Sequence, residues 1–287
     1  MDHADADYLD AKRTVDDRAL SPRVRDRLLD ELPPEPRILE AGVGTGAMVA
    51  RLVEWGVAGT YRGVDRSREV LARARDGRAA ELDADPVEGG FDLDALDVRF
   101  ERGDALSAFD GERADLLVAS SFLDLVPITD ALDAFEAALR PGGLVYAPFT
   151  FDGATVFQPD HPADAAVEAA YHDHIDGQPG RDARAGRHLL DHLRERGGDL
   201  LSIASSDWVV RPRDGSYPAR EAAFLAAILE FVADAVERGS TGNASKSGDL
   251  DRPDADDWLR KRRRQLETGE LSYVAHQYDF LYRTPEP

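Results

Sequence analysis

Along the first half of the chain, short continuous apolar runs alternate with segments in which apolar residues recur every three or four positions. The runs predict buried strands and the segments between them predict amphipathic helices. Strands that alternate with helices of this length form right-handed βαβ units, so the pattern predicts a parallel, doubly wound sheet. The predicted strands are residues 37–42, 59–65, 97–100, 114–121 and 143–151, and the predicted helices between them are 47–55, 67–75 and 128–139.

Both ends of the chain depart from this alternation. Helical spacing over residues 8–32 is interrupted at Ser21 and Pro22, which predicts two helices. The acidic, poorly periodic stretch 77–96 predicts a loop with a short helix, and beyond Phe151 the alternation slackens. The later predicted helices are 162–175, 182–196, 219–237 and a segment around Trp258, the later strands are 199–212 and 271–283, and the small polar residues of 239–249 predict a mobile linker.

The length and the apolar content together set the domain organisation. With 287 residues, of which 43% are hydrophobic, the chain is long enough for one large domain or for a core with a lid. We expect an N-terminal helical cap over residues 1–35 and a core over 36–150. Residues 151–287 are expected to complete the sheet with its sixth and seventh strands and to add helical lid insertions.

The charge of the chain is unusual. Its formal net charge is −21, and its only lysines are Lys12, Lys246 and Lys261. Such a field repels nucleic acids and anionic membrane surfaces. We interpret it as a halophilic adaptation to high intracellular salt, where carboxylate repulsion is screened over about 3 Å at molar ionic strength. The alternative interpretation is an acidic mouth that attracts a cationic substrate.

Several kinds of site and location are excluded or disfavoured by what the sequence lacks. There are no cysteines, which excludes disulfides, thiolate metal sites and cysteine nucleophiles, and we expect no metal centre. No apolar run reaches the roughly 18–20 residues that span a bilayer. The first ten residues are acidic and lack the apolar segment of a signal peptide, so we expect a soluble cytoplasmic protein. The sequence predicts no particular oligomeric state.

The stretch ILEAGVGTG at 38–46 places glycines at every second position between a predicted strand and a predicted helix. A glycine turn there lets backbone N–H groups and the helix N-terminus approach a ligand. Glu40 suits a cationic ammonium and would repel a pyrophosphate. Asp65, at the end of the next strand, is placed to accept both hydroxyls of a ribose, and Asp104, after the third, to accept from an adenine amino group.

These features, with the RPGG turn at 140–143, resemble the class I S-adenosylmethionine-dependent methyltransferases over about residues 36–150. The resemblance implies a Rossmann-like α/β fold with a seven-stranded sheet, its last strand antiparallel, and S-adenosylmethionine as the cofactor. It implies that Glu40 lies near the methionine ammonium, that Asp65 holds the ribose, and that Ser120 lies beside the methionine part. The cofactor-binding residues expected from it are Glu40, Gly42, Gly44, Gly46, Asp65, Arg66, Asp104, Ala105 and Ser120, with Asp104 and Ala105 at the adenine.

Three other interpretations stay open. An NAD-dependent oxidoreductase needs a pyrophosphate beside Glu40, and its usual motif is GxGxxG, whereas this chain has GxGxG. A glycine turn without any ligand leaves the placed acidic residues unexplained. A fold that binds S-adenosylmethionine or its product without transferring methyl differs from an enzyme in having no polar substrate cavity beside the cofactor.

The acceptor is expected to be a small molecule. The chain lacks the Asn/Asp-Pro-Pro-aromatic run of nucleic-acid amino-methylating enzymes and the cysteine of RNA cytosine C5 enzymes. Methyl transfer is an in-line displacement that needs alignment and, for some acceptors, a base. The accepting atom stays open among O, N, C and S. The catalytic candidates are Asp124, Tyr171, His172 and His276. Further candidates for the lining of the acceptor site are Phe149, Phe151, His174, Trp208, Arg211 and Tyr217, and for each of them packing in the core or display on the surface is the alternative. Tyr8 or Arg13 is a candidate for contact with the cofactor carboxylate, and the alternative is that their helix lies on the surface.

Overall fold

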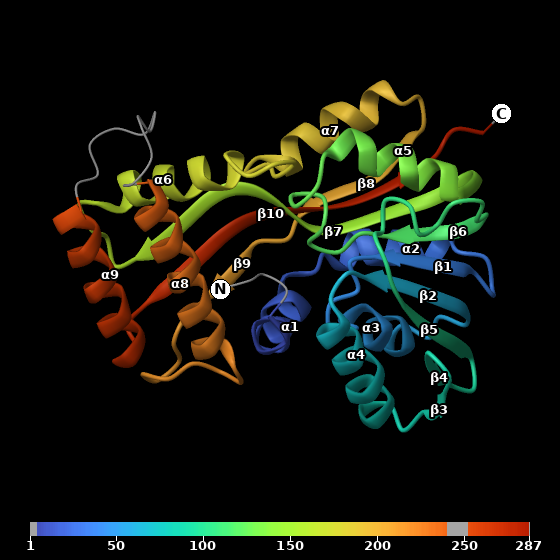
Figure 1. Cartoon of the computed structure of the whole chain (residues 1–287), viewed down its shortest axis with the longest axis horizontal. Coiled ribbons are helices and arrows are strands. Elements are labelled where there is room, and N and C mark those ends of the chain that lie inside the picture. Colours follow the sequence, from blue (N-terminus) through green and yellow to red (C-terminus); the bar gives the residue numbers. More distant parts are fainter. Residues whose placement is uncertain (1–4, 240–251, 287) are drawn as a thin grey trace.

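The apolar runs of the first half of the chain form the centre of a mixed sheet, and helices cover both of its faces (Figure 1). The computed structural model describes residues 5–239 and 252–286. The strands are β1 (Arg37–Ala41), β2 (Gly59–Asp65), β3 (Asp85–Val87), β4 (Gly90–Asp92), β5 (Leu96–Arg102), β6 (Ala114–Val118), β7 (Leu139–Gln158), β8 (Asp199–Ser205), β9 (Trp208–Val210) and β10 (Ser272–Arg283). The helices are α1 (Ala6–Ala19), α2 (Pro22–Glu31), α3 (Ala47–Glu54), α4 (Arg68–Glu81), α5 (Ile128–Ala138), α6 (Asp164–Asp176), α7 (Ala185–Glu195), α8 (Glu221–Gly239) and α9 (Arg252–Glu267).

The centre of the sheet is parallel, as the alternation of strands and helices predicts. β1 pairs in parallel with β2 and β6, β2 pairs with β5, and β6 pairs with β7. β10 runs antiparallel to both β7 and β8. The doubly wound α/β fold with an antiparallel last strand is therefore confirmed. The carboxyl ends of β1, β2, β5 and β6 meet at one edge of the sheet, where the glycine turn also lies.

Within residues 5–239 and 252–286, the sheet has ten strands rather than the expected seven. The stretch 77–96 is not a loop with a short helix, because its first residues extend α4 and the rest form the hairpin β3–β4 on the edge of β5. Phe91 anchors this hairpin: its ring is fully buried and lies 5.9 Å from that of Phe100. The expected strand over 199–212 is broken at Ser206 into β8 and β9, which pair with different parts of β10.

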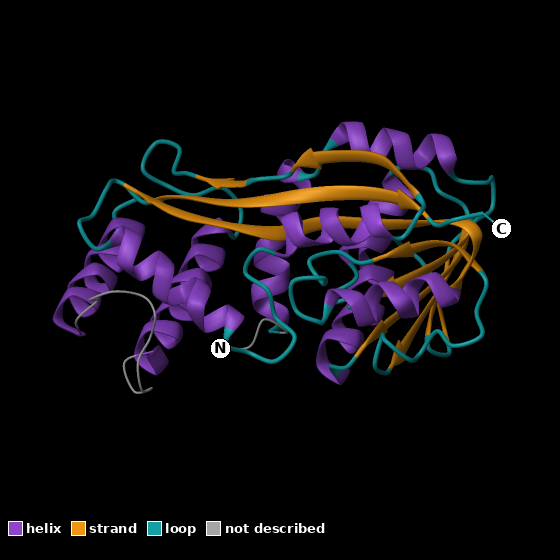
Figure 2. Cartoon of the chain, turned by 90° about the horizontal axis from the view of Figure 1, so that it is seen from above, coloured by secondary structure: helices purple, strands orange, loops and turns teal. Residues whose placement is uncertain are grey.

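β7 and β10 extend well beyond the parallel core. β7 has 20 residues, and its pairing with β10 runs from Leu144 opposite Arg283 to Gln158 opposite Ser272. The expected strand stops at Phe151, but buried and exposed residues continue to alternate through Phe157, so the strand continues. Seen from above, the two long strands run past the others, and α6, α8 and α9 lie beside their outer part (Figure 2).

The outer part of β7 and β10 has a hydrophobic core of its own. Phe224 of α8, Trp258 of α9 and Tyr273 of β10 belong to one buried cluster, which α1 joins through Tyr8 and Val15. Two other clusters occupy the parallel part of the sheet. The first helix is therefore packed into the outer lobe as well as lying beside the glycine turn.

Two expectations concern the ends of helices. The break at Ser21 is confirmed, since the Ser21 hydroxyl caps α2 by accepting from the Val24 N–H and Pro22 is the first residue of that helix. The linker expected over 239–249 lies outside the described residues, apart from the last residue of α8.

Within 5–239 and 252–286, none of the helices combines the length and the apolar content that crossing a bilayer would require.

Candidate functional site

The glycine turn between β1 and α3 adopts a conformation that needs glycine. Gly42, Gly44 and Gly46 have φ angles of +72°, +55° and +75°. A Cβ atom at Gly42 would lie 2.5 Å from the Phe122 ring, so the turn also has no room for a side chain there. The Gly42 N–H donates to the Val64 carbonyl oxygen, which ties the turn to β2. Gly46 caps α3 and does not line the cavity described below.

Asp65 holds the glycine turn in place from the end of β2. Its Oδ2 accepts from the Gly44 N–H at 3.0 Å and its Oδ1 accepts from the Ser67 N–H at 2.9 Å. Each carboxylate oxygen has a second lone pair, so both can still accept from a ligand hydroxyl. Asp65 is therefore organised by the backbone and open on the side of the cavity.

Asp104 follows β5 and is held in the same way. Its Oδ1 accepts from the Leu106 N–H at 3.1 Å, and its Oδ2 lies 2.7 Å from the Arg66 guanidinium. The Leu106 N–H and Arg66 together lower the pKa of the Asp104 carboxyl. Asp104 therefore remains an anion that accepts hydrogen bonds, and Ala105 beside it is buried against the cavity.

Glu40 is the buried carboxyl of this region. It lies on β1 with 2% of its surface exposed, and the Tyr61 hydroxyl donates to its Oε2. Burial raises the pKa of Glu40 to about 8, against the opposing effects of the Tyr61 hydrogen bond and the Arg51 charge. At neutral pH the carboxyl is therefore mostly protonated, and a cationic ligand beside it would favour the ionised form. This is the chemistry that an ammonium group requires.

These residues line one end of a cavity of about 360 Å³ that continues into the outer lobe. Ser120 and Ser121 lie between the two ends, directly after β6. The far end is lined by aromatic, aliphatic, polar and charged side chains from α1, α6, α8, β7, β9 and β10 and from the loops that carry Asp124 and Arg181. The cavity residues beyond the glycine turn include Tyr8, Lys12, Asp16, Asp124, Phe149, Phe151, Tyr171, Arg181, Trp208, Ile228, Tyr273 and Gln277.

The structure separates the sequence-predicted acceptor residues into two groups. Those that line the cavity are Asp124, Phe149, Phe151, Tyr171 and Trp208, and those that do not are His172, His174, Arg211, Tyr217 and His276.

The two histidine candidates for catalysis point elsewhere. His172 Nε2 lies 2.9 Å from the Thr155 hydroxyl, and burial lowers the pKa of the imidazole. His276 Nδ1 lies 2.7 Å from Asp207, on the face of β10 opposite to Gln277. Neither histidine lines the cavity, because strand alternation turns His276 away from it and the helical position of His172 directs it to β7.

Lys12 is a cavity residue that sequence reasoning missed. Its ammonium lies 2.7 Å from Asp16, 3.0 Å from the Ser121 hydroxyl and 4.9 Å from the Trp208 ring centroid. Asp16 in turn accepts from the Trp208 indole N–H at 2.9 Å. One signal was available, since Lys12 is a rare lysine in a chain whose positive charge is almost all arginine.

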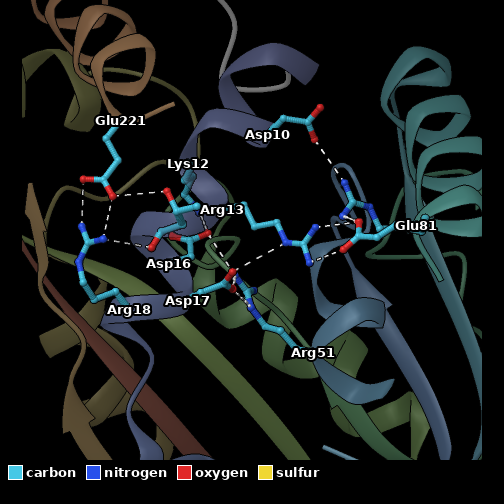
Figure 3. A network of polar contacts seen from close by, with 11 residues as sticks. Asp10, Lys12, Arg13, Asp16, Asp17, Arg18, Arg51, Glu81 and Glu221 are labelled. Atoms are coloured by element: carbon cyan, nitrogen blue, oxygen red, sulfur yellow. Dashed lines mark hydrogen bonds and ion pairs between the residues drawn. The ribbon is translucent and has the colours of Figure 1, made fainter. Parts of the chain in front are cut away.

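Charged side chains of α1 connect the two lobes around this cavity (Figure 3). Arg13, a candidate for the cofactor carboxylate, pairs with Glu81 of α4 at 2.7 Å and does not line the cavity. Asp17 pairs with Arg51 of α3 at 2.8 Å. Arg18 reaches the other way and pairs with the buried Glu221 of α8 at 2.7 Å.

Metal ligation finds no support in the described part of the chain. Among residues 5–239 and 252–286, acidic and histidine side chains form no group of three or more that could hold a metal ion. Several charged groups of the cavity are instead held by other groups of the protein: Lys12 pairs with Asp16, Arg66 pairs with Asp104, and Asp65 accepts from backbone N–H groups.

Residues 38–143 match the family model described as a methyltransferase domain. A putative methyltransferase from Bacillus halodurans is 14% identical with a TM-score of 0.54, over 92% of this chain and 100% of its own. The YcgJ protein from Bacillus subtilis is 14% identical with a TM-score of 0.51, over 92% of this chain and 97% of its own. No curated protein matches the chain. At 14% identity, the likeness to these two solved structures shows only that they share the fold of this chain.

Proposed function

We propose that this chain transfers a methyl group from its cofactor to a small-molecule acceptor. The chain carries a class I S-adenosylmethionine-dependent methyltransferase domain, and S-adenosylmethionine is the cofactor. One observation carries the proposal. A single cavity joins the residues expected at the cofactor with a second compartment that contains polar side chains. A protein that only bound the cofactor would have no use for such a compartment.

The cofactor end of the cavity fits the groups that the cofactor would bring. We assign the ammonium to Glu40, the ribose hydroxyls to Asp65 and the adenine amino group to Asp104. Ala105 would pack against the adenine ring, and Ser120 would lie beside the methionine part. Gly42 and Gly44 would admit the cofactor close to the backbone, Gly46 would begin the helix behind it, and Arg66 would orient Asp104.

The bound cofactor supplies a methyl carbon already activated by the sulfonium charge. The contribution of the chain is then to align the acceptor, to exclude water and, where the acceptor carries a proton, to remove it. The aromatic walls of the far compartment can do the first two. This division supports the three parts expected from the sequence: a cap over 1–35, a cofactor core over 36–150 and a lid-bearing part over 151–287.

The size and charge of the protein support a small acceptor. The whole cavity, with the cofactor end included, measures about 360 Å³, so the part beside the cofactor has room only for a small molecule. The net charge of −21 disfavours nucleic acid and anionic membranes as partners. We also propose that the acidic composition adapts a cytoplasmic enzyme to high salt, so binding and activity belong at molar potassium chloride.

Calorimetric titration at molar potassium chloride with S-adenosylmethionine, S-adenosylhomocysteine and NAD tests the cofactor assignment. Binding of the first two in the micromolar range, without binding of NAD, is the expected result. Binding of NAD alone would show that the glycine turn is the dinucleotide site of an oxidoreductase.

A second measurement tests transfer. S-adenosylhomocysteine formation is followed with the small-molecule fraction of a cell extract and, in parallel, with its protein and nucleic-acid fractions. Product in the small-molecule fraction alone is expected. Cofactor binding without product in any fraction would favour the binding module.

A further inference from the structure

Asp124 is the one catalytic candidate from the sequence whose carboxylate lies in the cavity without a protein partner for one of its oxygens. It follows β6 closely, and its Oδ1 is buried and has no hydrogen-bond partner. The Asp182 N–H donates to the Asp124 carbonyl oxygen at 3.1 Å, which ties the loop after β6 to the segment before α7. This bond fixes the main chain at Asp124, and no protein donor is bound to Oδ1 of its carboxylate.

A second oxygen in the cavity is in the same condition. Gln277 of β10 is 1% exposed, lines the cavity and has an Oε1 atom without a partner. A buried acceptor oxygen without a donor costs about 1–3 kcal/mol. Two such oxygens in one chamber favour a ligand that brings its own donors.

The body of that ligand is indicated by the walls of the chamber. Tyr8 and Tyr273 are nearly fully buried, and Tyr8 stacks 5.8 Å from Phe224 behind it. Phe149 and Trp208 close another side. Flat, rigid side chains of this kind pack against an aromatic or polycyclic ring system.

The charge of the ligand is indicated by Lys12. Its ammonium already occupies the position over the Trp208 ring at 4.9 Å and lies 5.5 Å from the Phe149 ring centroid. Asp16 neutralises it at 2.7 Å. The position that a cationic acceptor would take against these rings is therefore occupied by the Lys12 ammonium. Because Asp16 already neutralises that ammonium, this pair leaves no charge for an acceptor to balance, and a neutral acceptor fits.

We propose that the acceptor is a neutral aromatic compound that carries a hydroxyl group, and that Asp124 is the catalytic base that removes the proton of this hydroxyl. The inference rests on the proposed methyl transfer and names its acceptor class. The hydroxyl proton passes to the Asp124 carboxylate, and the oxygen forms a bond to the methyl carbon. The carbon–sulfur bond breaks with its electron pair on sulfur, so that a methyl ether, S-adenosylhomocysteine and a protonated Asp124 result.

The surroundings of Asp124 suit a base that works near neutral pH. Burial raises the pKa of its carboxyl to about 6, and the charges of Arg181 and Lys12 oppose this rise. A base with such a pKa is ionised at pH 7 yet holds a proton better than an exposed aspartate does. The groups that face it are Tyr8 and Lys12 from α1, Tyr171 from α6, and Arg181 and Asp182 from the segment before α7.

The test uses the full chain at molar potassium chloride with three matched sets of probes. Each set carries a hydroxyl, an amine or a carboxylate on the same ring, from naphthalene to three- and four-ring systems. S-adenosylhomocysteine formation should occur with hydroxylated members alone. Methylation of the amines or carboxylates in preference, or no turnover of any hydroxylated member by a protein that binds the cofactor, would overturn the inference. Failure to bind the cofactor would instead be a failure of the proposed function.

Variants test the base on the best hydroxylated probe. Asp124→Asn should lower kcat by roughly 100-fold or more while the cofactor Kd changes less than about twofold. Asp130→Asn, an exposed carboxylate on α5, is the matched control and should be unaffected. In the wild type kcat should fall below about pH 6, and Asp124→Glu should recover part of the activity. An unchanged kcat in Asp124→Asn, or a flat wild-type profile between pH 5 and 8, would show that Asp124 is not the base.

Discussion

The two ends of the cavity differ in how their polar groups are satisfied. At the cofactor end, Asp65 accepts two backbone N–H groups, Asp104 accepts one and pairs with Arg66, and Glu40 accepts from Tyr61. At the acceptor end, Asp124 and Gln277 each keep an oxygen without a partner. The first end is organised before any ligand binds, whereas the second leaves part of its hydrogen bonding to the ligand.

The largest effect is expected at the organised end. Asp65→Ala removes the acceptor of the Gly44 N–H and the proposed acceptor of the ribose hydroxyls. Each charge-assisted hydrogen bond contributes about 1.5–3 kcal/mol, so the cofactor Kd should rise by roughly 100-fold or more. Calorimetry against Asp110→Ala, an exposed carboxylate, provides the comparison.

Gly44→Val should have a similar consequence for a different reason. A valine would be strained at φ +55°, and its Cβ would lie 3.2 Å from Leu9 of α1. Near-wild-type affinity in both variants would break the assignment of the cofactor end.

The difference between the ends also explains what the sequence could predict. Carboxyl ends of parallel strands meet at one edge, so Glu40, Asp65 and Asp104 could be placed together from their positions after predicted strands. The acceptor end depends on long-range packing. Tyr8 joins it only because α1 packs on α8, and Trp208 only because β9 pairs with the outer part of β10. No local pattern fixes such contacts, which is why histidines appeared as candidates and Lys12 did not.

Asp279 is a buried residue that ties the acceptor end to the junction of α1 and α2, and its loss should be next in size. Its Oδ1 accepts from the N–H of Phe149, a cavity residue with φ +59°, and its Oδ2 from the Ser21 N–H between α1 and α2. Asp279→Asn retains one acceptor oxygen and leaves one buried N–H facing an amide NH2. The free energy of unfolding should fall by about 1–3 kcal/mol, whereas Asp199→Asn at an exposed site of β8 should change it little.

The pH dependence of unfolding identifies the same carboxyl. Burial raises the pKa of Asp279 in the folded protein, so the folded state favours its protonated form. Its contribution to stability should therefore decrease as pH rises from about 4, the ordinary value for aspartate, through the raised value. Denaturant unfolding across this range should show a shallower decrease in Asp279→Asn. An equal pH dependence in both proteins would contradict this account.

A matched pair of variants on α1 tests whether this helix supports the acceptor end of the cavity more than the cofactor end. Arg18 pairs with Glu221, whose side chain is 1% exposed, whereas Arg13 pairs with Glu81, whose side chain is 38% exposed. Arg18→Ala leaves a buried carboxylate without its cation and should cost about 1–3 kcal/mol of stability and raise the acceptor KM. Arg13→Ala should cost less than about 1 kcal/mol. Equal effects in thermal unfolding and on KM would mean that α1 does not hold the acceptor end.

The smallest expected effect concerns the protonation of Glu40. The pKa of about 8 means that this carboxyl is mostly protonated in the free protein at pH 7. The cofactor ammonium would favour the carboxylate, so binding at pH 7 should release about one proton. Calorimetry in two buffers of different ionisation enthalpy measures the released proton. Glu40→Gln can still accept from Tyr61 but has no proton to release, so its binding enthalpy should be independent of the buffer. If the wild type also showed no buffer dependence, the ammonium would lie away from Glu40, and the cofactor end would be organised around Asp65 and Asp104 alone.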